Sequence, residues 1–254
     1  MYAIVLTHDV QLGLAELVHK RYCALWPGHP LTFRIPVNGS GEGSALSYLR
    51  GQADCDLVPS PRPIGATMKA LVDGIPDDIW VYWCIDDRFP TWLDADAVDN
   101  VCAGLDAAPP DVEEVKLLRW RERLSGEITQ VGPVAFAVQA QGPRAWGFWH
   151  HHFIRAGTLR RVFVDTGLPG DVAIGDVLSR FGDPRRQRTR QGRAARDCFR
   201  GSALVPTRPL VELGEPLVRG LLTRNGLDEL RRWDCEVPPY AAIDRETVYT
   251  WADG

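Results

Sequence analysis

The stretch IWVYWCIDDRFP, residues Ile79 to Pro90, decides how the rest of the chain is interpreted. Its first seven residues are aromatic, β-branched or otherwise apolar, and a run of this length is typical of a buried strand. The run ends in two adjacent carboxylates, Asp86 and Asp87, and Pro90 is expected to stop regular strand pairing. In open α/β sheets, ligands bind beyond the carboxyl ends of the strands. The stretch therefore predicts a central strand that carries two acids to a ligand-binding edge.

Two carboxylates at that edge suit a particular chemistry. They offer hard oxygen ligands to a divalent cation, and the cation can hold a diphosphate. The alternative is that Asp86 caps a turn and Asp87 is simply solvated, because Asp is frequent in turns that follow strands.

The residues before this stretch predict a β-α-β unit. Tyr2–Leu6 is a compact apolar run, and leucines from position 12 to position 25 then recur at helical spacing until Trp26-Pro27-Gly28. Leu31–Val37 is a second expected strand. This alternation favours a parallel sheet with a right-handed crossover. The glycine-rich loop at positions 38–43 lacks the order of a dinucleotide fingerprint, and we interpret it as a surface connection.

Further elements are expected from periodicity and from turn residues. Expected strands are Ala53–Val58, Val112–Trp120, Gly132–Gln139 and Trp146–Phe153. Expected helices are Ser44–Arg50, Ile64–Val72, one capped by Asp94, Thr158–Val164, Asp171–Phe181 and part of Gly214–Trp233. The character of the chain changes near residue 120, so residues 1–120 and 121–254 are expected to form two halves of one domain.

The amino-acid composition limits which class of protein this can be. The chain has 254 residues, 45% of them hydrophobic, and a formal net charge of −4, which indicates a globular protein without a global attraction to nucleic acid or membranes. Its six cysteines have no CxxC spacing, so the sequence predicts neither a zinc site nor a redox motif, and their scatter favours a reducing compartment. Neither a signal peptide nor a membrane span is indicated, and a cytoplasmic location is expected.

The order of several motifs resembles a group of bacterial glycosyltransferase-like proteins with a GT-A-type fold, which are tied to lipopolysaccharide or other surface glycans. The resemblance rests on Ile4–Asp9, Leu25–Pro30 and Ile85–Phe89, and more weakly on Phe153–Leu159. It covers roughly residues 1–165. The usual Asp-x-Asp signature is replaced here by an adjacent pair, with Arg88 where an aromatic residue is usual.

The resemblance implies an α/β, GT-A-like (Rossmann-like) fold, with a mostly parallel sheet flanked by helices and a smaller acceptor-side part toward the C-terminus. It implies that residues 1–120 bind a nucleoside-diphosphate sugar and that residues 121–254 face a glycan, lipid-linked or small-molecule acceptor. The implied activity is transfer of the sugar between them. A catalytically inactive GT-A-like protein with a binding or scaffold role is the alternative, favoured by Arg88 and by the missing Asp-x-Asp. A nucleotidyltransferase is disfavoured, because no Gly-rich, Arg- or Lys-bearing phosphate loop follows the first strand.

The resemblance also implies roles for the strand-end residues. Thr7, His8 and Asp9, which follow the first strand, would approach the donor nucleotide. Asp86 and Asp87 would bind Mg²⁺ or Mn²⁺, which stabilises the diphosphate as a leaving group. Because the pair departs from Asp-x-Asp, the alternative is that one of the two acids binds ribose and only the other binds the cation. Arg88 is a further donor-binding candidate.

The second half supplies a histidine triplet. In a strand, His150 and His152 share a face and His151 points the other way. Ring nitrogens on the shared face can complete a metal site or bind a phosphate oxygen. The alternative is a polar, partly exposed strand end.

An inverting transferase needs a carboxylate base, whereas a retaining one does not. The candidates are Asp165, Asp171 and Asp176. Asp171 can instead cap the helix expected there, whereas Asp176 lies inside that helix and is preferred.

Eight arginines lie between Arg180 and Arg200. They can contact the donor diphosphate or an anionic acceptor. They can also make a peripheral membrane contact if the acceptor is lipid-linked, or form a solvated loop. Nucleic-acid binding is not indicated, because aromatic residues are sparse among these arginines and the chain is acidic.

Overall fold

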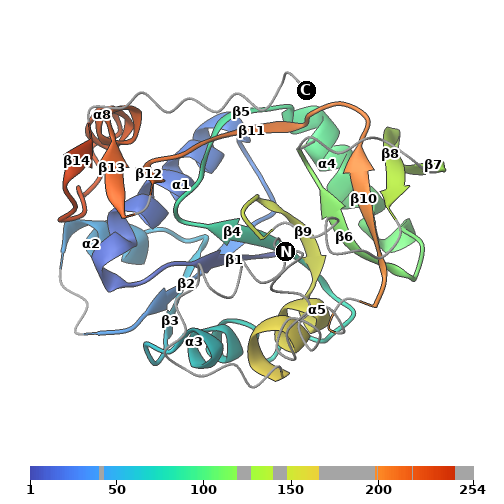
Figure 1. The fold of residues 1–254 in the computed structure, drawn as a ribbon, viewed down its shortest axis with the longest axis horizontal. Coiled ribbons are helices and arrows are strands. Elements are labelled where there is room, and N and C mark those ends of the chain that lie inside the picture. Colours follow the sequence, from blue (N-terminus) through green and yellow to red (C-terminus); the bar gives the residue numbers. More distant parts are fainter. Residues whose placement is uncertain are drawn as a thin grey trace.

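The computed structural model describes residues 1–39, 43–118, 127–139, 148–165, 198, 200–218 and 220–243. Its centre is a nine-stranded sheet with the order β3-β2-β1-β4-β9-β6-β10-β8-β7 (Figure 1). The strands are β1 (Tyr2–Leu6), β2 (Thr32–Val37), β3 (Cys55–Pro59), β4 (Trp80–Ile85), β6 (Val112–Lys116), β7 (Ile128–Val131), β8 (Val134–Gln139), β9 (His152–Arg155) and β10 (Ser202–Pro206). Both halves of the chain contribute strands to this one sheet.

Most of the sheet is parallel. β3, β2, β1 and β4 are parallel neighbours, and β6 is parallel to β10. β9 is antiparallel to both β4 and β6, so these two strands run the same way. The expected α/β class, with a mostly parallel sheet flanked by helices, is confirmed. The carboxyl ends of β1, β2, β4 and β6 therefore meet at one edge of the sheet.

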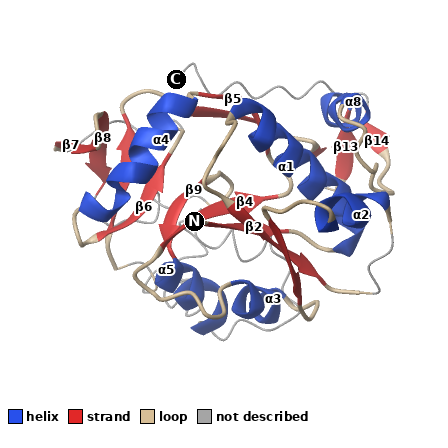
Figure 2. Ribbon diagram, turned by 180° about the vertical axis from the view of Figure 1, so that it is seen from behind, coloured by secondary structure: helices blue, strands red, loops and turns tan. Residues whose placement is uncertain are grey.

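Helices cover both faces of the sheet (Figure 2). α1 (Leu12–Leu25) and α4 (Ala95–Gly104) lie on one face, and α3 (Ile64–Leu71) and α5 (Ala156–Arg160) lie on the other. α2 (Ser44–Arg50) packs beside α1. Three short helical turns, η1 (Asp9–Gln11), η2 (Leu105–Ala107) and η3 (Arg161–Asp165), lie next to longer helices. Within the described ranges, each helix is too short or too polar to cross a membrane.

Strand β4 separates two apolar cores, and all six of its residues are buried. Trp80, Tyr82 and Cys84 join the core beneath α1 and α4. Trp83 and its neighbours at positions 81 and 85 join the core beneath α3 and α5. Successive strand residues point to opposite faces, so a strand covered on both faces must be apolar throughout. This explains why the run was recognisable in the sequence.

The expectation that Pro90 ends strand pairing was wrong. Phe89–Leu93 forms β5, which pairs with β11 (Val211–Gly214) in a separate two-stranded sheet. Pro90 lies opposite Leu213, next to an irregularity in the ladder. A two-stranded ribbon has two edges, so a residue without an N–H is tolerated there.

The C-terminal half differs from expectation in two places. The strand expected from Trp146 begins only at His152, because residues 148–150 form a turn and a bend. Part of the expected tail helix is replaced by β12 (Leu217–Val218) and β13 (Leu221–Thr223), and β13 pairs with β14 (Ala242–Ile243). Helix α8 (Arg224–Arg232) starts only after Thr223, whose hydroxyl caps it by accepting from the Gly226 N–H. The helix expected at 171–181 lies outside the described residues.

Candidate functional site

Thr7 and Asp86 lie side by side where β1 and β4 end. The two strands are parallel neighbours with Leu6 opposite Ile85, so the residue after each strand reaches the same point. Thr7 Oγ1 donates a 2.6 Å hydrogen bond to Asp86 Oδ2, and both residues are buried. Burial raises the pKa of Asp86 well above its ordinary value; the Thr7 hydrogen bond lowers it, and the charge of Asp87 raises it further. Without a cation, Asp86 therefore holds its proton more tightly than a solvated aspartate does.

Asp87 has one oxygen that lacks a hydrogen bond. Its Oδ1 is buried and has no hydrogen-bond partner among the residues that the structure describes. Arg88 Nη1 lies 3.8 Å from that oxygen and donates to the Asp87 backbone carbonyl at 2.8 Å. Burial raises the pKa of Asp87, and the guanidinium of Arg88 opposes the rise. A buried acceptor without a donor is uncommon in proteins and indicates a site for a donor or a cation.

Arg88 also joins this edge to a distant segment. Its Nη2 forms an ion pair with Glu215, which directly follows β11, and both side chains are buried. Tyr240, from the C-terminal segment, lies near enough to Asp86 that, after burial, the Asp86 charge raises the pKa of the phenol. Residues from three parts of the chain thus meet at the two carboxylates.

His151 is held firmly by its hydrogen bonds. Its Nε2 donates to the Ile85 carbonyl at 3.0 Å, and its Nδ1 accepts from the Tyr22 hydroxyl at 2.7 Å. Burial lowers the pKa of His151 to about 4, so the ring is neutral at physiological pH. The ring therefore fastens the end of β4 to α1, and both of its nitrogens are occupied.

His152 and His150 lie in a buried polar cluster beside β6. His152 Nδ1 donates to the His150 carbonyl at 2.8 Å, and its Nε2 lies 3.3 Å from Glu114 Oε1. Lys116 is opposite His152 across the strands, and its charge adds to burial in lowering the pKa of His150 and His152. The pKa of His152 falls to about 3. The sequence analysis did not single out Glu114 or Lys116.

The four residues predicted to bind metal do not converge on one point. Across the described ranges, only one set of three or more His, Cys, Asp or Glu side chains has ligand atoms within 4.8 Å of one another, and it lies elsewhere. A cation that carries a diphosphate needs only one or two protein carboxylates. Asp86 and Asp87, whose Oδ1 accepts no hydrogen bond from the described residues, fit that donor set. His152 faces Glu114 instead, and His150 contributes its backbone carbonyl to His152.

Asp9 and His8 lie next to the end of β2. Asp9 Oδ1 accepts a 2.7 Å hydrogen bond from the backbone N–H of Asn38, which follows β2. The Asp9 carboxylate therefore ties the ends of β1 and β2 together, and a side chain at Gly39 would meet its other oxygen. His8 is exposed beside it.

The remaining predicted residues are not described. Asp171 and Asp176 lie outside the described residues, as does most of the segment Arg180–Arg200. Arg200 itself is exposed, and its backbone N–H donates to Glu113 at 3.1 Å.

Comparison with known proteins gives structural likenesses only. No protein-family model and no curated protein matches the chain. A crystal structure of an active-site mutant of LgtC is 12% identical, with a TM-score of 0.45, over 94% of this chain and 98% of that one. Galactosyltransferase LgtC in complex with donor and acceptor sugar analogues is 11% identical, with a TM-score of 0.42, over 92% of this chain and 94% of that one. Residues 1–349 of S. aureus TarS are 9% identical, with a TM-score of 0.44, over 83% of this chain and 58% of that one.

Proposed function

We propose that the chain is a glycosyltransferase that uses a nucleoside-diphosphate sugar bound at the carboxyl edge of β1 and β4. One observation carries the proposal: the buried Thr7–Asp86 hydrogen bond stands beside a buried Asp87 oxygen without a hydrogen-bond partner in the described residues. Ligand sites of open α/β sheets occur at this edge. The resemblance of the strand-end motifs to GT-A-type transferases supports the reaction class.

Different strand-end residues would bind different parts of the donor. Thr7 fixes the Asp86 carboxyl, which then presents its second oxygen to a ribose hydroxyl or to a cation. Asp87 offers an oxygen that accepts no hydrogen bond from the described residues. A divalent cation, Mg²⁺ or Mn²⁺, when bound there, would neutralise charge on the departing diphosphate. Arg88 supplies a fixed positive charge beside the same carboxylate.

Other contributions belong to the same proposal. His8 and Asp9 would border the nucleotide, and residues 1–120 would form most of the donor side. Asp176 or Asp171 would be the base of an inverting reaction, and the segment Arg180–Arg200 would contact an anionic or lipid-linked acceptor. The enzyme would work in the cytoplasm and would take nucleotide sugars as donors there.

A screen of donors tests the proposal directly. Thermal unfolding is followed with UDP-, GDP-, CMP- and dTDP-sugars, each with and without Mn²⁺. A ligand present at 100 times its Kd stabilises the fold by about 2.7 kcal/mol. Each kcal/mol raises Tm by about 2–4 °C in a chain of this size. We expect one nucleotide class to raise Tm and Mn²⁺ to increase that rise. No rise with any donor, with or without the cation, would overturn the proposal.

A binding protein without turnover is the second candidate. Arg88 is already paired with Glu215 and lies beside Asp87, so this edge contains a positive charge of its own. Such an arrangement can hold a nucleotide without a catalytic cation. Tight donor binding that is unaffected by a chelator, together with no sugar release or transfer, would favour this candidate.

A further inference from the structure

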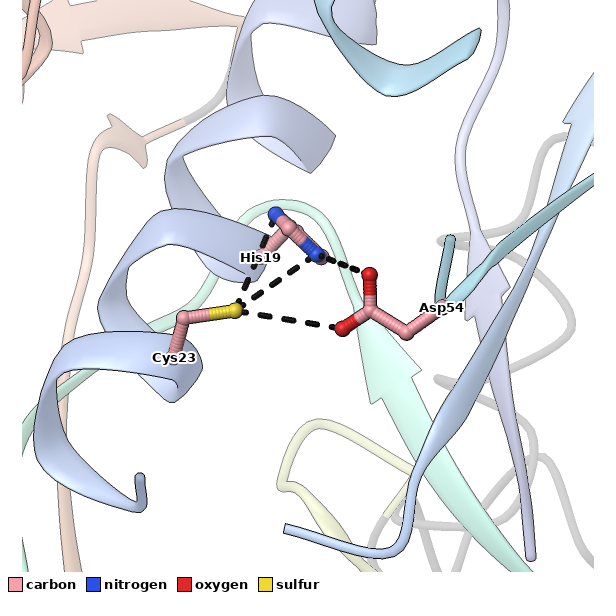
Figure 3. A group of neighbouring side chains, drawn as sticks. All are labelled: His19, Cys23 and Asp54. Atoms are coloured by element: carbon pink, nitrogen blue, oxygen red, sulfur yellow. Dashed lines mark hydrogen bonds and ion pairs between the residues drawn. The ribbon is translucent and has the colours of Figure 1, made fainter. Parts of the chain in front are cut away.

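A second cluster of reactive side chains lies at the opposite edge of the sheet. His19 and Cys23 are four residues apart on α1, so they share one face of that helix. Asp54 directly precedes β3, whose amino end lies away from the edge where the donor would bind. Figure 3 shows the three side chains pointing toward one another. They are the one set in the described ranges whose metal-ligating atoms lie within 4.8 Å of one another.

The distances suit a tetrahedral metal ion. Cys23 Sγ lies 3.5 Å from His19 Nε2 and 3.9 Å from Asp54 Oδ2, and His19 Nε2 lies 3.0 Å from Asp54 Oδ1. Around tetrahedral zinc, metal–ligand bonds of about 2.0–2.3 Å place neighbouring ligand atoms about 3.3–3.6 Å apart. These separations, in which the sulfur and the ring nitrogen face different oxygens of Asp54, lie within a few tenths of an ångström of those around the ion. A small rotation of the Asp54 carboxylate would present one oxygen to the ion together with Cys23 Sγ and His19 Nε2.

The surroundings orient the His19 ring for this role. Its Nδ1 lies 3.0 Å from the Tyr48 hydroxyl, which can accept the ring proton and leave Nε2 to bind a metal. The ring also makes edge contacts with Phe33 and Tyr48, and it is buried. About a third of the Asp54 side chain is exposed, which gives an ion a route from solvent.

His29 borders the cluster on a further side. Its Nε2 lies 3.5 Å from Cys23 Sγ and 3.7 Å from Asp54 Oδ2. Its Nδ1 accepts a 3.3 Å hydrogen bond from the Leu31 N–H, so in the neutral ring Nε2 carries the proton. We therefore assign His29 as a hydrogen-bond donor to the ligands and leave the fourth coordination position to water.

We propose that His19, Cys23 and Asp54 bind one zinc ion, which links α1 to the start of β3. A thiolate, an imidazole and a carboxylate together form a donor set that zinc accepts. The site is independent of the proposed sugar transfer, because it lies at the other edge of the sheet. The sequence analysis predicted no zinc site, since it searched for CxxC spacing. The signal was instead His-x₃-Cys on one helix face, completed by an aspartate 31 residues after Cys23.

The first experiment uses the full-length chain, stripped with a chelator under reducing conditions. It is titrated with Zn²⁺ against a chromophoric competitor, and Co²⁺ is added separately as a spectroscopic probe. We expect one equivalent of Zn²⁺ to bind and to raise Tm. Co²⁺ should give a thiolate-to-metal charge-transfer band and the strong visible bands of tetrahedral coordination. Binding of Zn²⁺ without the charge-transfer band would overturn the ligand assignment.

Variants locate the ion. Cys23→Ala should abolish the charge-transfer band and weaken Zn²⁺ binding at least 100-fold. Asp54→Asn, which keeps the shape of a partly exposed side chain, should weaken it at least tenfold without unfolding the chain. Cys102→Ala is the matched control, because Cys102 lies on α4 and is not one of the clustered side chains, and it should bind as the wild type does. His29→Ala should keep one equivalent of Zn²⁺.

Two results would overturn the proposal. One is equal Zn²⁺ affinity in the wild type and in folded Asp54→Asn and Cys23→Ala. The other is loss of binding in Cys102→Ala but not in Cys23→Ala. Mn²⁺-dependent donor binding is measured on Asp54→Asn as well, and it should be unchanged, which separates this site from the carboxyl edge.

Discussion

The Thr7 hydroxyl lies 2.6 Å from Asp86 Oδ2, and this buried contact joins the ends of two neighbouring parallel strands. The two residues are 79 positions apart in the chain, yet each is the first residue after its strand. The hydrogen bond orients the carboxyl and lowers the cost of burying it, because a carboxylate accepts hydrogen bonds more strongly than a neutral acid does.

Thr7→Val tests that contact. The substitution keeps the shape of the side chain but removes the donor, so Asp86 loses the hydrogen bond that lowers its pKa, and that pKa should rise further. We expect the free energy of unfolding at pH 7 to fall by about 1–3 kcal/mol and donor affinity to fall as well. Urea unfolding and donor titration measure the two effects. Thr7→Ser keeps the hydroxyl and should retain most of both; equal losses in the two variants would contradict the role of the hydrogen bond.

Asp87→Ala tests the role of Asp87 Oδ1, which accepts no hydrogen bond from the described residues. It removes the carboxylate that fits a cation while leaving backbone pairing intact, so metal-dependent donor binding should disappear and the fold should remain. Calorimetric titration with donor, with and without Mn²⁺, measures this effect. Asp228→Ala, at an exposed position on α8, is the control and should bind as the wild type does. Unchanged affinity in Asp87→Ala, with or without a chelator, would remove the cation from the mechanism.

The central strand and the first β-α-β unit could be predicted from the sequence because local pattern decides them. Tyr2–Leu6 and Trp80–Ile85 are short apolar runs that only a strand covered on both faces accommodates. β10 was missed, since its five residues gain their strand conformation from β6 and β8, which are distant in sequence. β5 was missed because the rule against proline in strands does not apply to the edge of a two-stranded ribbon.

Some contacts of the candidate site also follow from local sequence pattern, and others do not. That Thr7 and Asp86 meet follows from strand ends alone. That Glu114 and Lys116 lie beside His152 depends on the order of strands across the sheet, and that Glu215 meets Arg88 depends on the separate pairing of β11 with β5. Periodicity contains neither. The histidine triplet shows a further limit: the alternation expected of a strand does not extend to His150, because β9 begins at His152. The middle histidine instead makes the most closely defined contacts, to Tyr22 and Ile85.

Glu215→Gln tests the connection between β11 and the carboxylates. The change removes the charge that compensates Arg88, and both side chains are buried. Removing one partner of a buried ion pair leaves the other charge poorly compensated. Arg88 would keep its longer 3.8 Å contact with Asp87, and we expect a loss of about 3 kcal/mol in the free energy of unfolding. Arg208→Met is the control: it breaks the exposed ion pair with Asp94 and should cost less than about 1 kcal/mol. Equal losses of unfolding free energy in the two variants would show that the Arg88–Glu215 ion pair is not desolvated.

His151 should make the protein sensitive to acid. Burial lowers its pKa to about 4, whereas in the unfolded chain it titrates near the ordinary value of 6.5. Between pH 6.5 and about 4, the unfolded chain therefore binds a proton at this position that the folded chain does not bind. The free energy of unfolding contributed by His151 is fully present above pH 6.5 and is lost as the pH falls through that window, by about 3 kcal/mol in total.

Urea unfolding of the wild type and of His151→Gln at a series of pH values between 7.5 and 4.5 measures this contribution. Glutamine does not titrate, so the variant should lose less stability than the wild type as the pH falls, even if it is less stable at pH 7.5. Asp86 acts with the opposite sign, because its raised pKa favours the folded state in acid, but it is common to both proteins and cancels in the comparison. His8→Gln, at an exposed position, should leave most of the acid sensitivity in place. Parallel stability profiles for the wild type and His151→Gln would mean that the ring between Tyr22 and Ile85 can accept its proton without unfolding, and that its two hydrogen bonds do not hold it neutral.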